Sequence, residues 1–213
     1  MSEVRQQILD RIRRAVSERV SVTPGDLVRD YQQHDHLDRH ACIALMIDRL
    51  REYDAEVFEC LPAELSACIS DCLSKSKKRT FVVPQGLPGE WMLRGFTWKI
   101  DQDLSHAAIE NSDGVVTGCF AGIADSGTIV LHHSPQEGRR VISLLPDWHL
   151  CILRTSQIVE VLPQYFALCA EPPRLATYIS GPSATADIEM TRIKGVHGPR
   201  FLNVIVVHDE VLD

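Results

Sequence analysis

The sequence has no long apolar run and no closely spaced cysteine pair. No stretch of its 213 residues approaches the roughly 20 apolar residues that a membrane-spanning helix needs. The seven cysteines are an odd number, and no two of them form a C-x-x-C pair. The sequence therefore indicates no membrane span, no disulfide framework and no zinc or iron–sulfur site.

The nearest approach to a metal-ligand pair is Cys68 and Cys72, which are four positions apart and so share one helix face. Two thiols alone do not make a metal site, and a free cysteine commonly acts as a small buried hydrophobic residue. We therefore expect no metal to be bound by this chain.

The chain lacks an excess of positive charge, because its 29 acidic residues outnumber its 22 lysines and arginines and give a formal net charge of −7. A nucleic-acid partner would require a basic surface, so we expect none. The basic run Lys75–Arg79 follows a predicted helix, where cations interact favourably with the last carbonyls. The N-terminal residues include acids and no apolar segment of the secretory type, so we expect a cytoplasmic protein.

The apolar residues predict one large domain with a helical appendage. Val4, Ile8, Ile12 and Val16 recur every four residues and predict a helix over residues 2–20. A break with no apolar period follows it. We therefore divide the chain into an N-terminal helix and linker, residues 1–38, and a main domain, residues 39–213.

Helical and strand patterns alternate along the main domain. Helices are predicted over residues 41–53 and from Pro62, where Leu65, Ile69 and Leu73 form an apolar stripe. Shorter helical signals cover residues 105–112 and 158–170. The strand candidates are residues 55–60, 79–84, 96–100, 114–123, 127–133, 149–154, 176–180 and 201–208. This alternation predicts an α/β sandwich with a mostly parallel sheet, in which residues 121–133 form a locally antiparallel hairpin.

The first candidate ligand site is the turn in "GIADSGTIVL", residues 122–131. Asp125, Ser126 and Gly127 allow backbone amides to converge on an anion, and Thr128 adds a hydroxyl donor. The alternative is a plain hairpin turn, which the spacing alone favours. The stretch matches neither common nucleotide-binding glycine motif.

The second candidate is "EGRRVISLLPDWH", residues 137–149. A guanidinium from Arg139 or Arg140 beside a cleft would bind a carboxylate or phosphate. The alternative is a surface arginine that pairs with Glu137. His149 stands at the start of a predicted strand, where it either caps the strand end or contacts a substrate.

The third candidate is "ISGPSATADIEMTRIKGVHGP", residues 179–199. Ser180 ends a predicted strand, Gly181 begins the turn after it, and Ser183 or Thr185 is placed to cap a helix that begins there. A strand, a glycine turn and a helix start form a common ligand-binding arrangement in α/β sheets.

Acidic side chains follow in the same stretch. Asp187 and Glu189 fall in the first turns of the predicted helix, where they disfavour an anion but suit a cation, a hydroxyl-rich ligand or acid–base chemistry. His197 lies between Gly195 and Gly198, and its spacing does not separate a general base from a structural histidine, of which we favour the structural one.

Together, "ADSGTIVL" (124–131), the pattern R-x-x-S-L-L-P-x-x-H (140–149) and the stretch 179–199 resemble the LUD domain of the lactate-utilization protein C family. The resemblance runs in order from about residue 40 to the C-terminus. It implies a three-layer α/β sandwich of the type shared by ribose-5-phosphate isomerase, glucosamine-phosphate deaminase, CoA transferases and formyltetrahydrofolate cyclo-ligase.

The resemblance also implies a role in oxidising L-lactate to pyruvate together with iron–sulfur and cysteine-rich partner proteins. Since this sequence has no cysteine motif of that kind, electron transfer would belong to the partners, and the chain would bind no cofactor itself. The competing reading is a stand-alone enzyme, or a ligand-sensing domain, for a small phosphorylated or carboxylated metabolite. The enzyme reading predicts that Asp125, Ser126, Thr128, Arg140, Ser180, Ser183 and Asp187 converge on one pocket.

Overall fold

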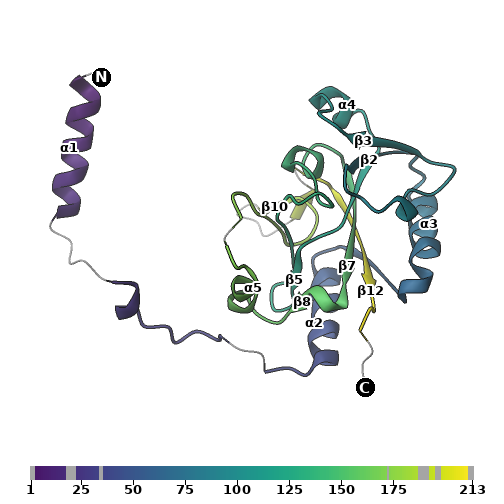
Figure 1. Ribbon diagram of the computed structural model, residues 1–213, viewed down its shortest axis with the longest axis horizontal. Coiled ribbons are helices and arrows are strands. Elements are labelled where there is room, and N and C mark those ends of the chain that lie inside the picture. Colours follow the sequence, from purple (N-terminus) through teal and green to yellow (C-terminus); the bar gives the residue numbers. More distant parts are fainter. Residues whose placement is uncertain are drawn as a thin grey trace. The chain divides into compact units, whose positions relative to one another are not determined.

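The structure is a computed structural model that describes residues 3–17, 23–33, 36–171, 173–186, 192–194 and 198–210. The chain divides into two compact units, residues 1–31 and residues 32–213. Figure 1 traces both units in colours that follow the sequence. Within the described residues, no helix is long and apolar enough to cross a membrane.

The first unit contains the helix predicted near the N-terminus. α1 (Glu3–Ser17) confirms that prediction over its described length, and the short 3₁₀ turn η1 (Pro24–Asp26) lies further along the unit. The side chains of its predicted apolar stripe are between 53% and 63% exposed: Val4, Ile8, Ile12 and Val16. The stripe is therefore an exposed apolar surface.

A six-stranded sheet forms the centre of the second unit, and all of its strand pairs are parallel. Its strands run in the order β1 (Glu56–Cys60), β12 (Phe201–Val207), β7 (Trp148–Arg154), β4 (Gly114–Thr117), β2 (Thr80–Pro84) and β3 (Thr97–Asp101). The predicted α/β class with a mostly parallel central sheet is confirmed.

Alternate side chains of β7 and β12 face two separate cores, and this creates three layers. Ile152 and Ile205 pack into the core beneath α3 (Leu65–Ser76). Leu153 and Val204 pack into the core beneath α2 (Arg39–Glu52) and a second, smaller sheet. Figure 1 shows α3 on one side of the central sheet and α2, β5 and β8 on the other. Burial on both faces explains why these strands are continuous apolar runs.

Capping and turn residues in the sequence set the ends of the two long helices of this unit, α2 and α3. The Asp38 carboxylate accepts a hydrogen bond from the Ala41 amide, 2.8 Å away, and so caps α2. The short 3₁₀ turn η2 (Pro62–Glu64) leads into α3, whose predicted stripe is buried: Leu65, Ile69 and Leu73. α3 ends at Lys77, which adopts a left-handed conformation with φ +59°, at the basic run predicted for this helix end.

The second sheet contains the predicted hairpin. β5 (Ala121–Ile123) and β6 (Thr128–Leu131) pair antiparallel around a turn in which Gly127 has φ +58°. β8 (Ile158–Val159) extends the sheet beside β5, and β9 (Thr177–Ile179) extends it beside β6. α5 (Leu162–Leu168) packs Tyr165 against the outer face of the hairpin.

Three sequence predictions were wrong in their boundaries or type. Residues 114–123 form two strands in different sheets, because the chain leaves the central sheet after Thr117. The helix predicted over residues 158–170 begins only at Leu162, because the preceding residues pair with β5. Residues 184–186 of the helix expected after Ser183 form strand β10 (Ala184–Ala186) instead, which pairs antiparallel with β11 (Arg192–Lys194), and the rest of that expected helix lies outside the described residues. Between β3 and β4 the chain forms α4 (His106–Glu110), as the sequence indicates.

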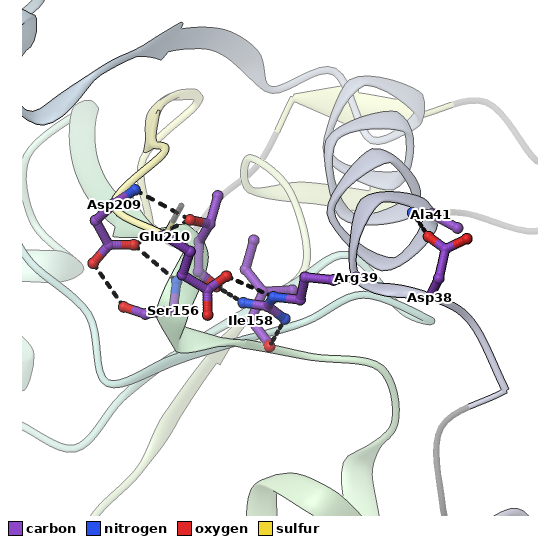
Figure 2. Close-up of polar contacts among 8 residues, drawn as sticks. Asp38, Arg39, Ala41, Ser156, Ile158, Asp209 and Glu210 are labelled. Carbon is purple, nitrogen blue, oxygen red and sulfur yellow. Dashed lines mark hydrogen bonds and ion pairs between the residues drawn. The ribbon is translucent and has the colours of Figure 1, made fainter. Parts of the chain in front are cut away.

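Arg39, at the start of α2, forms hydrogen bonds with the segment after β7 and with Glu210, which follows β12 (Figure 2). Its guanidinium donates to the Glu210 carboxylate at 2.6 Å, to the Ile158 carbonyl at 2.7 Å and to the Thr155 carbonyl. Beside it, the Asp209 carboxylate accepts hydrogen bonds from Ser156 and Thr155. These contacts hold the connection between β7 and β8 against the end of β12.

A buried carboxylate holds the segment that precedes α2. Glu160 accepts hydrogen bonds from the Gln32 side chain at 2.8 Å and from the amides of His36 and Leu37 at 2.7 and 2.9 Å. Burial by itself raises the pKa of Glu160, but these hydrogen bonds outweigh it and place the pKa below the usual value. The compact unit accordingly begins at Gln32.

Candidate functional site

A chain of hydroxyl groups joins the first and third candidate stretches. The Thr128 hydroxyl lies 2.8 Å from the Ser126 hydroxyl and 2.8 Å from the Ser180 hydroxyl. β6 and β9 are paired neighbours, so the turn before β6 and the turn after β9 reach the same edge of the small sheet. Two motifs that are distant in sequence therefore form one polar surface.

This surface forms the floor of a cavity of about 570 Å³, called here the hairpin hollow. Asp125, Ser126, Thr128 and Ser180 supply its polar groups. Its remaining walls are apolar or aromatic: Ile123, Leu162, Phe166 and Tyr178. Gly127 does not line this hollow. A side chain at position 127 would lie 2.6 Å from Cβ of Arg49 in α2, so this glycine serves the close packing of the hairpin on that helix.

A second cavity of about 330 Å³, the β9 hollow, adjoins the first. The two share Tyr178 and Ser180, and the β9 hollow adds Arg140, Gly181 and Ser183 to its lining. Gly181 has φ +92°, and a side chain there would lie 2.7 Å from Cβ of Tyr53. The turn after β9 is therefore open only to glycine.

The predicted site residues thus divide between two neighbouring hollows, with Ser180 in both. Thr185 lies in β10, directly after Ala184, which lines the β9 hollow. Asp187, Glu189 and His197, the candidates for proton transfer, lie outside the described residues. The sequence predicted a single pocket, whereas the described residues form two cavities that meet at β9.

The second candidate stretch places its two arginines differently. Arg139 does not pair with Glu137. It binds Asp101 through two hydrogen bonds of 2.8 and 2.5 Å, and this pairing raises the pKa of the guanidinium. Glu137 is only 3% exposed and accepts hydrogen bonds from the amides of His132 and Ser134. Arg140 lines the β9 hollow, is exposed, and has no ion-pair partner among the described residues.

His149 lines the β9 hollow but is held within the central sheet. The ring is 1% exposed, and its Nε2 lies 2.8 Å from the Thr117 hydroxyl of β4. Burial lowers the pKa of His149 to about 4, so the ring is neutral near pH 7. A neutral imidazole that is hydrogen-bonded to Thr117 brings no positive charge to the hollow.

Comparison with known proteins identifies the family. The model of the LUD domain matches residues 43–207. The chain belongs to the LUD domain family. A relative named Lactate utilization protein C, from Deinococcus radiodurans, is 36% identical over 97% of this chain and 96% of its own length. A protein of the same name from Bacillus velezensis is 28% identical over 84% of this chain and 83% of its own length.

A solved structure supports the same assignment. The crystal structure of a DUF162 family protein from Deinococcus radiodurans matches with a TM-score of 0.69 and 35% sequence identity, over 80% of this chain and 99% of that chain. The resemblance read from the three sequence motifs is therefore confirmed at the level of the family.

The LUD domain also has a polar network that the sequence analysis missed. His132 Nε2 lies 2.8 Å from the Tyr165 hydroxyl, which accepts a hydrogen bond of 3.3 Å from the Tyr178 hydroxyl. The His132 ring stacks on Phe120 with centroids 3.7 Å apart. Burial raises the pKa of Tyr165 and lowers that of His132, so both groups are neutral near pH 7. In the sequence, the only indication of this network was that His132, Tyr165 and Tyr178 carry polar groups beside or within apolar segments.

The cysteines of this LUD domain are buried or half-buried thiols. Burial raises the pKa of Cys60 and of Cys72 to about 12 each, so neither is a thiolate near neutral pH. Within the described part of the chain, no three histidine, cysteine or acidic side chains form a metal-binding group.

Proposed function

We propose that this chain acts in lactate utilisation, as the subunit without a redox centre in a complex that oxidises L-lactate to pyruvate. The proposal is supported by the name of the Deinococcus radiodurans relative, which matches almost the whole chain. In this proposal the electrons pass to partner proteins that carry iron–sulfur clusters and cysteine-rich motifs. This chain contributes a binding site for a small anionic metabolite.

The observation that carries the binding role is the position of Arg140 in the β9 hollow. Its guanidinium is exposed beside the Ser180–Gly181 turn and has no ion-pair partner within the described residues. A guanidinium presents paired N–H donors that match the two oxygens of a carboxylate. The Ser180 hydroxyl at the same wall supplies a further polar contact. The carboxylate of lactate or pyruvate fits this set of donors.

Calorimetric titration of the full chain with L-lactate and with pyruvate tests the binding role. Arg140→Ala should weaken binding by about 1.5–3 kcal/mol, because a charge-assisted hydrogen bond is lost. Arg94→Ala removes an exposed arginine that lines neither the hairpin hollow nor the β9 hollow and is the matched control. Equal affinities for Arg140→Ala and the wild type would remove Arg140 from the site.

Purification from the native host tests the assignment to a complex. A tagged full-length chain should bring down proteins with cysteine-rich and iron–sulfur motifs, identified by mass spectrometry. Lactate-dependent dye reduction should accompany the complex and be absent from the chain alone. Recovery of a lone, fully active species would refute the assignment.

The second candidate function is a stand-alone enzyme or ligand sensor. The Thr128–Ser180 hydrogen bond favours this candidate, because the bond brings two candidate stretches to one polar surface. Under this reading the chain alone converts, or senses, a small phosphorylated or carboxylated metabolite. A thermal-shift screen of the purified chain against lactate, pyruvate, sugar phosphates, nucleotides and CoA esters, followed by a turnover assay, separates the two candidates. A ligand that stabilises the chain and is not consumed indicates a sensor.

A further inference from the structure

The central sheet has a point at which its connections change direction. After β2 the chain continues to β3, which lies on one side of it, whereas after β4 the next strand of this sheet is β7, on the opposite side. β2 and β4 are neighbours, so the crevice beyond their carboxyl ends is the switch point of the sheet. In open α/β sheets, ligands bind preferentially at this place.

The loop of residues 132–140 lies over this crevice and is fixed to both strand ends. The Gly86 amide, just after β2, donates to the Pro135 carbonyl at 2.9 Å, and the Gly118 amide, just after β4, donates to the Gln136 carbonyl at 3.1 Å. A side chain at position 86 would lie 2.7 Å from that Pro135 carbonyl oxygen. The backbones therefore approach as closely as glycine permits, and the loop has a fixed position over the strand ends.

Beside this loop lies a cavity of about 630 Å³, the switch-point hollow, which the functional proposal does not use. It is lined by Gln85, Gly86, Asp101, His133, Ser134, Pro135, Gly138, Arg139, Arg140 and Leu175. The volume is within the usual range for small-molecule sites. Its ionisable lining comprises two arginines, one carboxylate and one histidine, so positive charges outnumber negative ones in the hollow.

Hydrogen bonds within the protein hold one of the two arginines of this hollow in a fixed position. Asp101, buried, binds Arg139 through two hydrogen bonds, and the same guanidinium donates to the Leu104 carbonyl at 3.0 Å. Arg139 is thereby immobilised and its charge is balanced. Arg140, the next residue and the first of the 3₁₀ turn η4 (Arg140–Ser143), provides the positive charge that no described carboxylate balances.

The imidazole of His133 is fixed as well. Its Nδ1 lies 2.8 Å from the Gly138 carbonyl, which can only accept, so Nδ1 carries the proton. Its Nε2 lies 2.8 Å from the Thr177 hydroxyl, which is placed to donate a hydrogen bond to it. Thr177 lines the β9 hollow, so this hydrogen bond and Arg140 separate the two cavities.

We propose that the switch-point hollow is a second ligand site, for a small polar molecule that carries a phosphate or carboxylate group. The anionic group binds the Arg140 guanidinium and the Ser134 hydroxyl. The body of the ligand lies against Leu175 and Pro135. This inference goes beyond the proposed function, because it concerns a different cavity. Arg140 lies between that cavity and the β9 hollow and lines both of them.

The test is NMR titration of the isotope-labelled full-length chain with inorganic phosphate and, separately, with acetate. The amides of Gly86 and Gly138 report on the switch-point hollow, and those of Gly181 and Gly198 report on the β9 hollow. We expect saturable shifts of Gly86 and Gly138 with at least one of the two anions. The stronger of the two titrations identifies the anionic group. Absence of saturable shifts at both glycines with both anions would overturn the proposal.

Two bulky substitutions separate the cavities without touching Arg140. Leu175→Trp, at an exposed position of the switch-point hollow, should abolish the shifts, whereas Leu144→Trp, at an exposed position of the β9 hollow, should leave them unchanged. Shifts that survive Leu175→Trp and disappear in Leu144→Trp would assign the anion to the β9 hollow and refute the second site.

A third variant serves if Leu175→Trp does not fold. Ser134→Glu places a carboxylate in the hollow and should weaken binding by about tenfold or more, because like charges repel in the site. Unchanged affinity would refute the site. Titration of the same samples with L-lactate, read at Gly181 and Gly198, tests the proposed function separately, so failure of one proposal does not obscure the other.

Discussion

The hydroxyl groups of Thr128 and Ser180 lie 2.8 Å apart although the two residues are 52 positions apart in the sequence. Thr128 begins β6, and Ser180 follows β9, its antiparallel neighbour. The bond fixes the hairpin turn against the glycine turn at the edge of the small sheet. Both candidate hollows depend on this relationship because Ser180 lines each of them.

Thr128→Val tests this relationship, since valine keeps the shape of threonine and removes its hydroxyl. We expect the free energy of unfolding to fall by about 0.5–1.5 kcal/mol in urea denaturation, because Thr128 is buried and bonds two other hydroxyls. Thr97→Val, at an exposed position of β3, is the control and should change stability by less than about 0.5 kcal/mol. A neutral result for Thr128→Val would mean that water replaces the bond without cost.

Gly181→Ala should destabilise the chain by more than about 1 kcal/mol, because the left-handed backbone and the contact with Tyr53 both exclude a side chain. Gly89→Ala is the matched control, since a side chain there meets no atom within 4 Å. Its stability should be equal to or slightly above that of the wild type. Thermal unfolding followed by circular dichroism checks both variants. Equal melting temperatures for Gly181→Ala and the wild type would contradict the turn geometry.

The buried imidazole of His149 predicts a pH dependence of stability. Its pKa is about 4 in the folded chain and about 6.5 in the unfolded chain. Between these values the unfolded state binds the proton and the folded state does not, so the stability that is present above pH 6.5 decreases as the pH falls toward 4. The loss from this residue is on the order of 2–3 kcal/mol.

His149→Gln should therefore show a shallower decrease than the wild type when urea unfolding is measured at several pH values. His106→Gln, at the exposed start of α4, serves as the control and should follow the wild type. Parallel curves for the wild type and His149→Gln across this range would show that the ring is not held neutral.

Arg39→Lys should lower the free energy of unfolding by about 1–3 kcal/mol, because an ammonium group cannot reproduce contacts with Glu210, Ile158 and Thr155 at once. Arg51→Lys alters an exposed ion pair with Glu59 and should be nearly neutral. Amide exchange should rise around Ile158 in the first variant only. Equal exchange in the two variants would show that the Arg39 contacts do not hold this segment.

Local patterns in the sequence predicted most of the fold. The stripe of Leu65, Ile69 and Leu73 specifies a helix with one buried face, and the apolar run at 201–207 specifies a strand buried on both faces. The Asp-Ser-Gly turn specifies a hairpin, because Gly127 accepts a left-handed backbone at low cost. Each of these signals is contained within a few residues.

The failures arose where a distant partner decides the outcome. Residues 184–186 have caps and helix formers around them, yet pairing with β11 makes them a strand. The partner of Arg139 is Asp101 rather than its neighbour Glu137, and no local spacing encodes that choice. The switch-point hollow was missed for the same reason, because it depends on the order of strands in the sheet.

The position of β12 has a consequence for synthesis of the chain. This last strand lies between β1 and β7, so that Glu56 is opposite Asn203 and Trp148 is opposite Phe201. Until residues 201–207 leave the ribosome, β1 and β7 each present an unpaired edge, and the sheet is two separate pieces. The domain therefore completes its core only after residues 201–207 have been synthesised, and a nascent chain that stalls before them has unpaired strand edges that are prone to aggregate.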